Sequence, residues 1–538
     1  MKRPPNPFLA IIFVLAFSAL GFSSATNVYI TPDGSSQGAC TSSPQNPAWF
    51  NSASNWGSGA SQIGPGTTVT ICGTFTGVAG STEFTFQGNG TSGSPITLLF
   101  DSGAVVQAPY FAPSGGGTQC GGAICILNRS YVTIDGGTSG IIQNTANGQT
   151  LTYQKSSEAI EGFSCSSCTV RNLNIVNMYI HPTNNGGGGS IDQTQVRAIS
   201  MSGSNWTVNN NTIHDCGWCL FQAYGNNDTN TQIYNNNIYN MDHGWMLATG
   251  SSNSFTNAFF HDNQVHDTGN WDASGCPFHH DGIHTFGTNG SKMSGVYIYN
   301  NYFYGSWGSC QTGFIFIEGG GSSTPSHMQS FAVWNNVGIV GAGSGLDTNG
   351  WFGLFSGESG TQQVFNNTIL GPNNSDNSLC YSMYGLSNLS FQNNVVTNCG
   401  DPVEINSSTF LAANVDHNFY GTSCGNGNNC FVWNNNFKGS FPNWKPACLC
   451  DSHGLQSNSA LLNSDGSPQT GSPVIGAGMN LTSIATGILA SLKDDTSQGD
   501  KRTPAARPPS GNWDAGAFLF GSGGGAPNPP TGLAAVVH

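Results

Sequence analysis

The densest group of titratable side chains in the sequence lies between His279 and His284, where the residues are His-His-Asp-Gly-Ile-His. It directly follows Trp271 to Phe278, an insertion that we expect to form a loop. An imidazole beside a carboxylate is oriented and kept basic, which suits proton abstraction next to a carbonyl group. Several imidazoles with carboxylates could equally bind a divalent metal. The competing interpretation is an inert polar ladder at a turn; we favour a functional role because such a cluster is costly to bury without use.

Two upstream segments also place acidic side chains just before a glycine, at positions 215–217 and 242–244. If Gly217, Gly244 and Gly282 stack, the residues before them form two columns. The first column holds Cys216, His243 and Asp281, and the second holds Asp215, Asp242 and His280. Because paired strands lie about 4.8 Å apart, Asp242, His243, His280 and Asp281 would then be close neighbours. His284 would lie on the strand of Asp281, and Asp215 one layer further away.

The elements that would hold these columns in register form a repeat that begins near residue 200. Each copy places an aromatic or aliphatic residue before an Asn-Asn pair, as in Val208-Asn-Asn-Asn-Thr-Ile213. The second Asn position recurs at residues 211, 236, 263, 301, 336, 367, 394 and 418, in steps of 24 to 38 residues. This spacing is typical of a solenoid whose unit cannot bury its own apolar face. Asn turns corners through the left-handed backbone region, and stacked Asn amides can bond from coil to coil.

Composition excludes several classes of protein. The net charge is −14, from 27 acidic against 13 basic residues, so we expect no nucleic-acid partner, because phosphate binding needs clustered cations. Beyond the N-terminus, no apolar stretch reaches the roughly 20 residues of a membrane span. Lys2, Arg3 and apolar residues 8–22 instead predict a signal peptide that is cleaved after Ala25, with a retained anchor as the alternative. We therefore expect a secreted, extracellular monomer.

The 16 Cys residues of such an exported chain predict disulfides. Two pairs have CxxC spacing, Cys165/Cys168 and Cys216/Cys219. A redox-active pair needs its first Cys at a helix N-terminus, where the dipole lowers the thiol pKa. No helical periodicity follows Cys219, so we expect local structural disulfides. A zinc site is disfavoured because the two pairs belong to different coils.

Segments at both ends of the chain carry a family resemblance. They are Gly90 to Phe100 (GTSGSPITLLF), Ser472 to Gly478 (SPVIGAG), Arg507-Pro-Pro and Trp513 to Phe518 (WDAGAF). With the Asn-pair coils, they resemble the pectate-lyase-like superfamily, and most of all its secreted bacterial β-helix repeat proteins. The resemblance covers nearly the whole mature chain and implies an all-β fold, a single-stranded right-handed parallel β-helix solenoid with N- and C-terminal caps. It does not imply one reaction, since the superfamily includes lyases, hydrolases, epimerases, esterases and non-catalytic adhesins.

The expected organisation has five parts. A signal peptide occupies residues 1–25, and the N-terminal cap with the first coils occupies residues 26–123. The β-helix coils fill residues 124–455, and the C-terminal coils and cap fill residues 456–520. Residues 521–538 are a Gly/Pro-rich linker and a module-like tail.

Within this fold, Asp281 and Asp242 are predicted to form the acid/base pair, because two close carboxylates push their pKa values apart. Hydrolysis of a glycoside uses such a pair, one carboxyl on each side of the bond. His243, His280 and His284 would orient these groups or the substrate. The predicted substrate contacts are Trp271, as a platform for a sugar ring, His279 and Asp215. Weaker candidates are Asp262, His266, Asp267, Glu318, Asp347 and Glu358. No residue is assigned to a metal, although a divalent cation such as Ca²⁺ is an open alternative.

Charge separates the candidate reactions. No Lys or Arg occurs between Arg197 and Lys292. Lyases and epimerases that act on uronic acids must neutralise a carboxylate, for which this superfamily generally uses Arg, Lys or Ca²⁺. We therefore expect the partner to be a polysaccharide and the activity to be that of a glycoside hydrolase rather than a lyase. The alternative is a non-catalytic extracellular protein for glycan binding or adhesion, since long solenoids offer extended binding faces.

Overall fold

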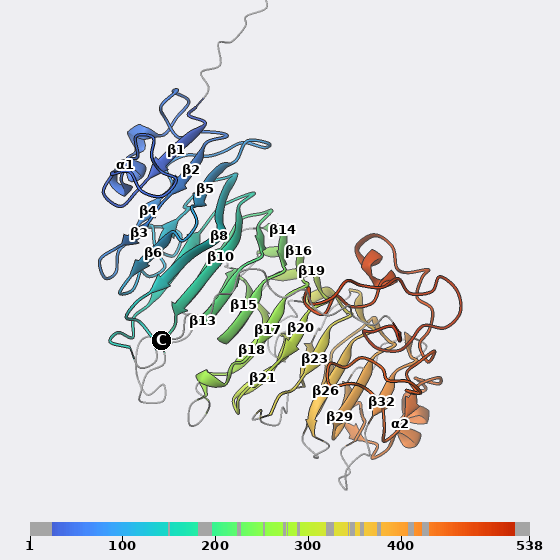
Figure 1. The fold of residues 1–538 in the computed structure, drawn as a ribbon. Helices are drawn as coiled ribbons and strands as arrows, with labels where there is room; N and C mark the ends of the chain where they lie inside the picture. Colours follow the sequence, from blue (N-terminus) through green and yellow to red (C-terminus); the bar gives the residue numbers. More distant parts are fainter. Residues whose placement is uncertain are drawn as a thin grey trace, which may run out of the picture.

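The strands of the chain stack in parallel, coil upon coil, into an elongated solenoid (Figure 1). The computed structural model describes residues 24–148, 151–180, 196–222, 227–250, 253–272, 276, 278–287, 291–318, 328–342, 344, 350–355, 360–373, 378–406, 414–421 and 430–521. Among the strands described, the single antiparallel ladder joins β33 (Val432–Trp433) to β34 (Asn436–Phe437). None of the described helices is long and apolar enough to cross a membrane.

Each coil contributes strands to three parallel sheets. Sheet 1 contains β4 (Phe84–Thr85), β7 (Ile124–Cys125), β9 (Ser157–Gly162), β11 (Val196–Met201), β13 (Thr212–Gln222), β15 (Asn237–Thr249), β18 (His280–Gly287), β21 (Gln311–Ile317), β24 (Phe352–Phe355), β27 (Leu379–Tyr384), β30 (Asp401–Asn406) and β33. Sheet 2 contains β1 (Asn27–Ile30), β2 (Thr68–Ile71), β5 (Ile96–Phe100), β8 (Val132–Asn144), β10 (Thr169–Met178), β12 (Thr207–Asn209), β14 (Asp228–Tyr234), β16 (Ser254–His261), β19 (Lys292–Tyr299), β22 (Met328–Trp334), β25 (Gln362–Phe365), β28 (Leu389–Gln392) and β31 (Val415–Asp416).

Sheet 3 lies between the other two along the chain. It contains β3 (Thr74–Thr76), β6 (Val105–Ala108), β17 (Gln264–His266), β20 (Tyr302–Tyr304), β23 (Val337–Ile339), β26 (Thr368–Asn373), β29 (Val395–Cys399), β32 (Phe419–Gly421) and β35 (Leu455–Gln456), together with parts of β8, β10, β13 and β15. The long strands β13 and β15 bend from sheet 3 into sheet 1. The same coil thus carries its repeat corner and its candidate site on one continuous strand.

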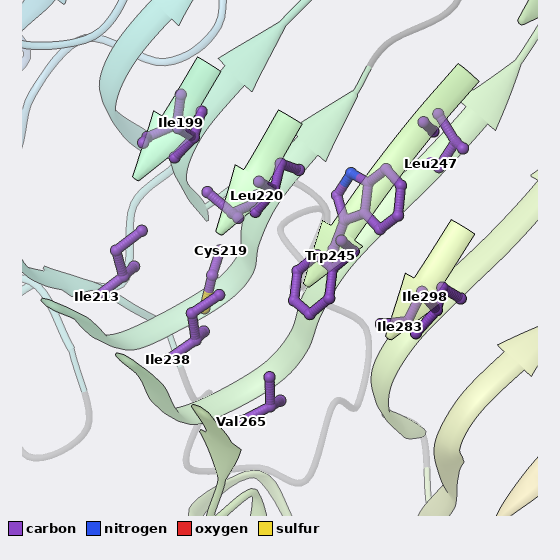
Figure 2. Packing of buried hydrophobic residues seen from close by; sticks show 14 of the residues in the cluster. Ile199, Ile213, Cys219, Leu220, Ile238, Trp245, Leu247, Val265, Ile283 and Ile298 are labelled. Carbon is purple, nitrogen blue, oxygen red and sulfur yellow. The ribbon is translucent and has the colours of Figure 1, made fainter. Parts of the chain in front are cut away.

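Apolar side chains fill the interior in stacks that follow the strand register (Figure 2). In sheet 1, Leu220 pairs with Trp245, which pairs with Ile283, and all three are fully buried. In sheet 3, Ile238 pairs with Val265 in the same way. Fully burying one such side chain stabilises a fold by about 1.5–3 kcal/mol. The stacks therefore fix the register that places residues some thirty positions apart side by side.

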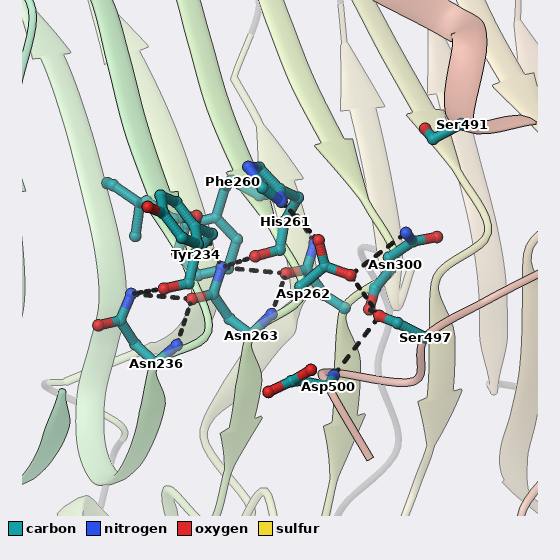
Figure 3. Close-up of polar contacts among 12 residues, drawn as sticks. Tyr234, Asn236, Phe260, His261, Asp262, Asn263, Asn300, Ser491, Ser497 and Asp500 are labelled. Carbon is teal, nitrogen blue, oxygen red and sulfur yellow. Dashed lines mark hydrogen bonds and ion pairs between the residues drawn. The ribbon is translucent and has the colours of Figure 1, made fainter. Parts of the chain in front are cut away.

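The Asn repeat forms a continuous amide ladder between sheets 2 and 3, of which Figure 3 shows the step from Asn236 to Asn263. Asn236 Nδ2 donates to Asn263 Oδ1 at 3.0 Å, and Asn263 Nδ2 donates to Asn301 Oδ1 at 3.2 Å. The bond repeats at each step from Asn211 to Asn418, and Asn418 then donates to the Asp451 carboxylate at 3.2 Å. The residue before each ladder position is left-handed, with φ between 51° and 60°. Both predicted roles of the Asn pairs are confirmed.

The described residues after β35 cover the side of the solenoid instead of adding coils. Asn335 Nδ2 donates to Asp494 O at 2.9 Å, Asn366 Nδ2 to Gly516 O at 3.0 Å, and Asn393 Nδ2 to Met479 O at 2.8 Å. This C-terminal strap, residues 457–520, lies beside the yellow and orange coils in Figure 1 and includes the 3-10 helix η5 (Gly487–Lys493). The strap adds no coil, which corrects the expectation of C-terminal coils in this segment. Its backbone carbonyl groups instead accept hydrogen bonds from the outward-pointing amides of the left-handed Asn residues.

Short helices lie at the two ends of the stack. At the N-terminal end, α1 (Pro47–Asn51) buries Phe50 against Phe84. At the other end, α2 (Phe441–Cys448) packs Phe441 and Trp444 on Tyr420. Aromatic rings thus cover the ends of the apolar interior. The stacking of sheet 2 already begins with β1, so coils are present throughout the segment expected to hold the first coils and the cap.

Disulfides link neighbouring positions along the solenoid. The predicted local pairs, Cys165–Cys168 and Cys216–Cys219, are both formed. The other pairs are Cys40–Cys72, Cys120–Cys125, Cys276–Cys310, Cys380–Cys399 and Cys448–Cys450. Cys424 lies outside the described residues. This density of disulfides is typical of proteins that fold in an oxidising compartment.

Candidate functional site

The candidate site lies where β15 and β18 pair in sheet 1, with His243 opposite Asp281. The strands bend there, and each has a glycine at the bend. A Cβ on Gly282 would lie 2.4 Å from the backbone oxygen of Phe314 and 2.9 Å from the ring of Phe303. Only glycine allows this close approach of neighbouring coils.

Four side chains converge there: His243, His279, Asp281 and His284. Asp281 Oδ2 lies 3.2 Å from His243 Nε2, 3.5 Å from His284 Nδ1 and 3.6 Å from His279 Nε2. His284 Nδ1 lies 3.4 Å from His243 Nε2. The side chains of His243 and Asp281 are fully buried, whereas that of His279 is 48% exposed. We call these residues the His/Asp cluster; His279 is its contact with solvent.

The Asp281 carboxylate is both buried and unsatisfied. Neither of its oxygens meets the geometry of a hydrogen bond, and its polar contacts are the ion-pair distances to three imidazoles. An unsatisfied buried polar group destabilises a fold by about 1–3 kcal/mol, and a charged group by more. This carboxylate is therefore a feature that requires a functional explanation.

Carboxylates hold the imidazoles of the cluster from behind. Asp242 Oδ2 lies 2.5 Å from His243 Nδ1, and Asp242 Oδ1 lies 3.1 Å from His280 Nδ1. On its other side, His280 Nε2 lies 3.1 Å from Asp272 Oδ1. The backbone N–H of Ser309 donates to Asp272 at 2.8 Å. A relay of alternating carboxylates and imidazoles, buried except at Asp272, thus leads from the insertion to Asp281.

The remaining imidazole has a carboxylate partner of its own. His284 Nε2 lies 3.2 Å from Glu318 Oε2, on the coil that follows. The Nδ1 of His284 is left to face His243 and Asp281. In both His243 and His284, one ring nitrogen therefore faces a carboxylate and the other faces the centre of the cluster.

Burial and charge move the pKa values in opposite directions. Burial alone would lower the pKa of His243, but the carboxylates of Asp242 and Asp281 outweigh it and raise that pKa to about 9. Burial would likewise raise the pKa of Asp242, but His243 and His280 hold it below its usual value. The pKa of His280 is raised, because Asp242 and Asp272 outweigh its burial. Desolvation lowers the pKa of His279, although Asp281 opposes this effect.

An aromatic and cationic surface continues the cluster along sheet 1. The register places Arg197 beside Trp218, and Trp218 beside His243. Trp218 is partly exposed and packs with Phe163 and Phe286 around the buried Phe221. The Arg197 guanidinium lies 4.0 Å from the ring centre of Phe221 and 3.3 Å from Glu158, which is buried. An extended ligand along this face would meet aromatic rings beside the imidazoles.

The coordinates bring together most of the residues predicted to form the site. Asp242, His243, His280, Asp281 and His284 are neighbours, with His279 at the rim. Their catalytic roles remain predictions. One assigned arrangement is corrected: the imidazole of His243 lies between Asp242 and Asp281 and faces both. These carboxylates therefore do not flank an open space in which a glycosidic bond could lie.

The predicted columns are shifted by two residues between the first two coils. Trp218, and not Cys216, lies opposite His243, and Leu220, and not Trp218, lies opposite Trp245. β13 and β15 keep the offset of 25 residues that separates Asn211 from Asn236, so Gly217 does not align with Gly244. Asp215 consequently lies away from the cluster, where its carboxylate is 2.6 Å from His214 Nδ1.

Trp271 is not an exposed platform. Trp271, the first residue of the insertion, ends the 3-10 helix η3 (Gly269–Trp271), and its indole is completely buried. It packs against Tyr179 at 4.5 Å and Phe278 at 5.5 Å between ring centres. Tyr179 also donates to Asn270 O at 2.8 Å. The insertion is thus anchored on sheet 1 by its aromatic residue, which corrects the predicted sugar-binding role.

The weaker candidates fall into three groups. The ring of His266 is stacked between Tyr239 and Tyr304, and its Nδ1 lies 2.7 Å from Asp267. Asp262 contacts His261 and the strap. These residues belong to structural stacks on other faces. Glu318 contacts the cluster. Asp347 and Glu358 lie outside the described residues. Asp272 was missed, although its place in the insertion just before the His-His pair was a usable signal.

Comparison with known proteins agrees with the architecture. Residues 197–319, which contain the whole cluster, match the family model described as right handed beta helix region. The chain is thus a right-handed parallel β-helix, as its resemblance to pectate-lyase-like proteins predicted. No curated protein matches the chain at the sequence level.

Several solved structures are similar to the chain. Pectate lyase Pel9A is 15% identical with a TM-score of 0.32, covering 93% of this chain and 97% of that one. A PL6 family polysaccharide lyase from Pseudopedobacter saltans is 12% identical with a TM-score of 0.30, covering 83% and 95%. A mannuronic acid specific family 6 lyase from human gut microbiota is 12% identical with a TM-score of 0.23, covering 69% and 86%. No residue role is carried over from these proteins.

Proposed function

We propose that the chain is an extracellular enzyme that cleaves a polysaccharide at the His/Asp cluster. The observation that carries the proposal is the Asp281 carboxylate, which is buried, accepts no hydrogen bond and has three imidazole nitrogens within 3.6 Å. A polar cluster with a purely structural role satisfies its buried groups. A buried charge that remains unsatisfied next to a half-exposed imidazole is expected where a ligand completes the site.

The neighbouring surface supports a glycan as substrate. Trp218 and Phe286 extend from the cluster along sheet 1, and partly exposed rings of this kind can stack on the apolar faces of sugars. Because consecutive coils repeat the same surface, several sugar units of one chain could lie across them. A flat, evenly polar face would have favoured the non-catalytic alternative.

For the reaction type, we propose elimination from an acidic polysaccharide rather than hydrolysis. Hydrolysis needs two carboxyl groups on either side of the bond, and His243 lies between the two that were predicted for that role. Elimination needs a base beside the acidic carbon and positive charge for the substrate carboxylate. The imidazoles of the cluster can supply both, which removes the main argument against a lyase, the lack of Lys and Arg in this segment.

The test is a comparison of the wild type with Asp281→Asn on a panel of polyuronates and neutral glycans. We expect the wild type to release products with an unsaturated bond, detected by ultraviolet absorbance, and Asp281→Asn to be at least about 100-fold slower. His266→Gln, in a stack on another face of the same coils, is the matched control and should retain activity. New reducing ends without the unsaturated bond would refute elimination, and binding without cleavage would refute the enzyme.

A further inference from the structure

We propose that His243, His279, Asp281 and His284 bind one divalent transition-metal ion of the zinc type. The inference rests on the proposed function in taking this cluster as the active centre, and it adds the identity of the group that completes it. The metal-facing atoms are His243 Nε2, His279 Nε2, His284 Nδ1 and an oxygen of Asp281.

The distances between these atoms fit one ion at their centre. Zinc–nitrogen distances of about 2.0–2.1 Å in a tetrahedron require ligand atoms roughly 3.3–3.4 Å apart. Asp281 Oδ2 lies 3.2, 3.5 and 3.6 Å from the three imidazole nitrogens, and those of His243 and His284 lie 3.4 Å apart. These separations are those of neighbouring ligands on one ion. An ion would also give the buried Asp281 carboxylate a direct partner, where it now has only ion-pair contacts with the imidazoles.

The outer contacts also match those of metal-binding histidines. A metal-bound imidazole generally donates its second N–H to a carboxylate, which fixes the tautomer and the ring orientation. His243 does so through Nδ1 to Asp242, and His284 through Nε2 to Glu318. Asp242 is itself held by His280. Asp242 and Glu318 are therefore positioning residues for the ligands and not ligands themselves.

The donor set selects the kind of ion. Three imidazoles and one carboxylate suit zinc, copper, nickel or iron, whereas Ca²⁺ takes six to eight oxygen ligands. Two other groups in the described residues are weaker. The group of Asp272, His280 and Cys310 has no thiolate ligand to offer, because Cys310 is disulfide-bonded to Cys276. In the group of Asp416, His417 and His453, the carboxylate already accepts hydrogen bonds from the backbone of both histidines.

Such an ion would supply a fixed positive charge that holds and polarises an anionic substrate group. The protein side of the arrangement is asymmetric, because three ligands are buried and His279 is half exposed. A ligand would therefore approach the centre from the side of His279. Arg197, which is occupied by Glu158, could not replace this charge.

The experiment measures zinc binding on the untagged full-length protein, without any activity readout. The protein is stripped with a chelator, dialysed and titrated with ZnCl₂ by calorimetry, and its metal content is measured by mass spectrometry. We expect one tight site per chain, and X-ray absorption with three imidazole nitrogens and one oxygen at about 2.0–2.1 Å. A stripped wild type that binds less than one equivalent, or binds zinc through sulfur, would overturn the proposal.

Variants assign the site to these residues. His284→Ala and Asp281→Asn should weaken zinc binding by more than about 100-fold, and Asp242→Asn by about 10–100-fold, as expected for an outer contact. His266→Ala is the control and should bind zinc as the wild type does. Unchanged affinity in both ligand variants would overturn the assignment. Zinc binding without cleavage of any glycan would support the metal site and refute the enzyme. Cleavage by the zinc-free protein would support the enzyme and refute the ion as the group that completes its active centre.

Discussion

Replacing Asn301 by Ala tests how far the amide ladder holds the coils together. The Asn301 side chain makes four hydrogen bonds across three coils. Its Nδ2 donates to Phe260 O at 2.9 Å and to Asn336 Oδ1 at 3.0 Å. Its Oδ1 accepts from the backbone N–H and the Nδ2 of Asn263, at 3.0 and 3.2 Å. All these atoms are buried, so water does not replace the lost partners.

At about 1 kcal/mol net for each hydrogen bond, Asn301→Ala should lower the free energy of unfolding by about 4 kcal/mol. The backbone N–H and Nδ2 of Asn263 would stay buried without their acceptor, which shifts the expected loss upward. In a solenoid, such a loss falls on the interface between adjacent coils. Hydrogen exchange should therefore accelerate in β17 and β20 but not in β2.

The assay is urea unfolding followed by tryptophan fluorescence, combined with hydrogen exchange by mass spectrometry. Asn512→Ala is the matched control, because the Asn512 side chain is exposed and donates a single bond, to Gly476 O at 3.0 Å. We expect this control to lose less than about 1 kcal/mol. If Asn301→Ala is as stable as Asn512→Ala and its exchange pattern is unchanged, the ladder does not stabilise the coil interfaces and the reasoning is refuted.

Three further predictions concern other buried groups. Burial raises the pKa of Glu158 to about 7, so the free energy of unfolding of the wild type should fall by up to about 3 kcal/mol as the pH rises from about 4.5 to 7. Glu158→Gln should flatten this pH dependence, measured by urea unfolding at both pH values. A variant with the same pH dependence as the wild type would contradict the prediction. Trp271→Ala should lower stability by about 3 kcal/mol, because the indole is buried; glycan affinity that drops at unchanged stability would instead support a binding platform. Cys216 and Cys219 are fully buried, so the native protein in mild reductant should not be alkylated there, as peptide mapping would show.

The repeat corner could be predicted from sequence because one residue type performs two local tasks there. The first Asn of each pair adopts the left-handed conformation, and the second bonds to its equivalent in the next coil. Each task depends on one position of the pair, so the ladder from Asn211 to Asn418 is visible as a period. The C-terminal strap has no period. Its contacts with Asn335, Asn366 and Asn393 join residues about 90 to 160 apart, and most use its backbone, which carries no side-chain signal.

The site was predictable where the glycines used to align the coils are in register, and the prediction failed where they are not. The step from β15 to β18 keeps the bend glycines aligned, so His243 meets Asp281 as expected. The step from β13 to β15 does not: these strands keep the offset of 25 residues that separates Asn211 from Asn236, whereas Gly217 and Gly244 are 27 residues apart, so Trp218 lies opposite His243. The burial of Trp271 could not be predicted for another reason: its partner Tyr179 lies about 90 residues away, just after the end of β10, and no sequence pattern links it to the insertion.

The separation of tasks within a coil explains how one pair of coils can carry a charged cluster. The interior stacks and the amide ladder hold the register from two sides, and neither uses the outer positions of sheet 1. Those positions vary freely along one column: Glu158, Arg197, Trp218, His243 and Asp281 follow one another in register. An unsatisfied carboxylate that destabilises the fold by a few kcal/mol is tolerable there, because the ladder bonds and buried stacks of the same coils exceed that amount. The solenoid can therefore hold the imidazole of His243 and the carboxylate of Asp281 next to each other on its outer face.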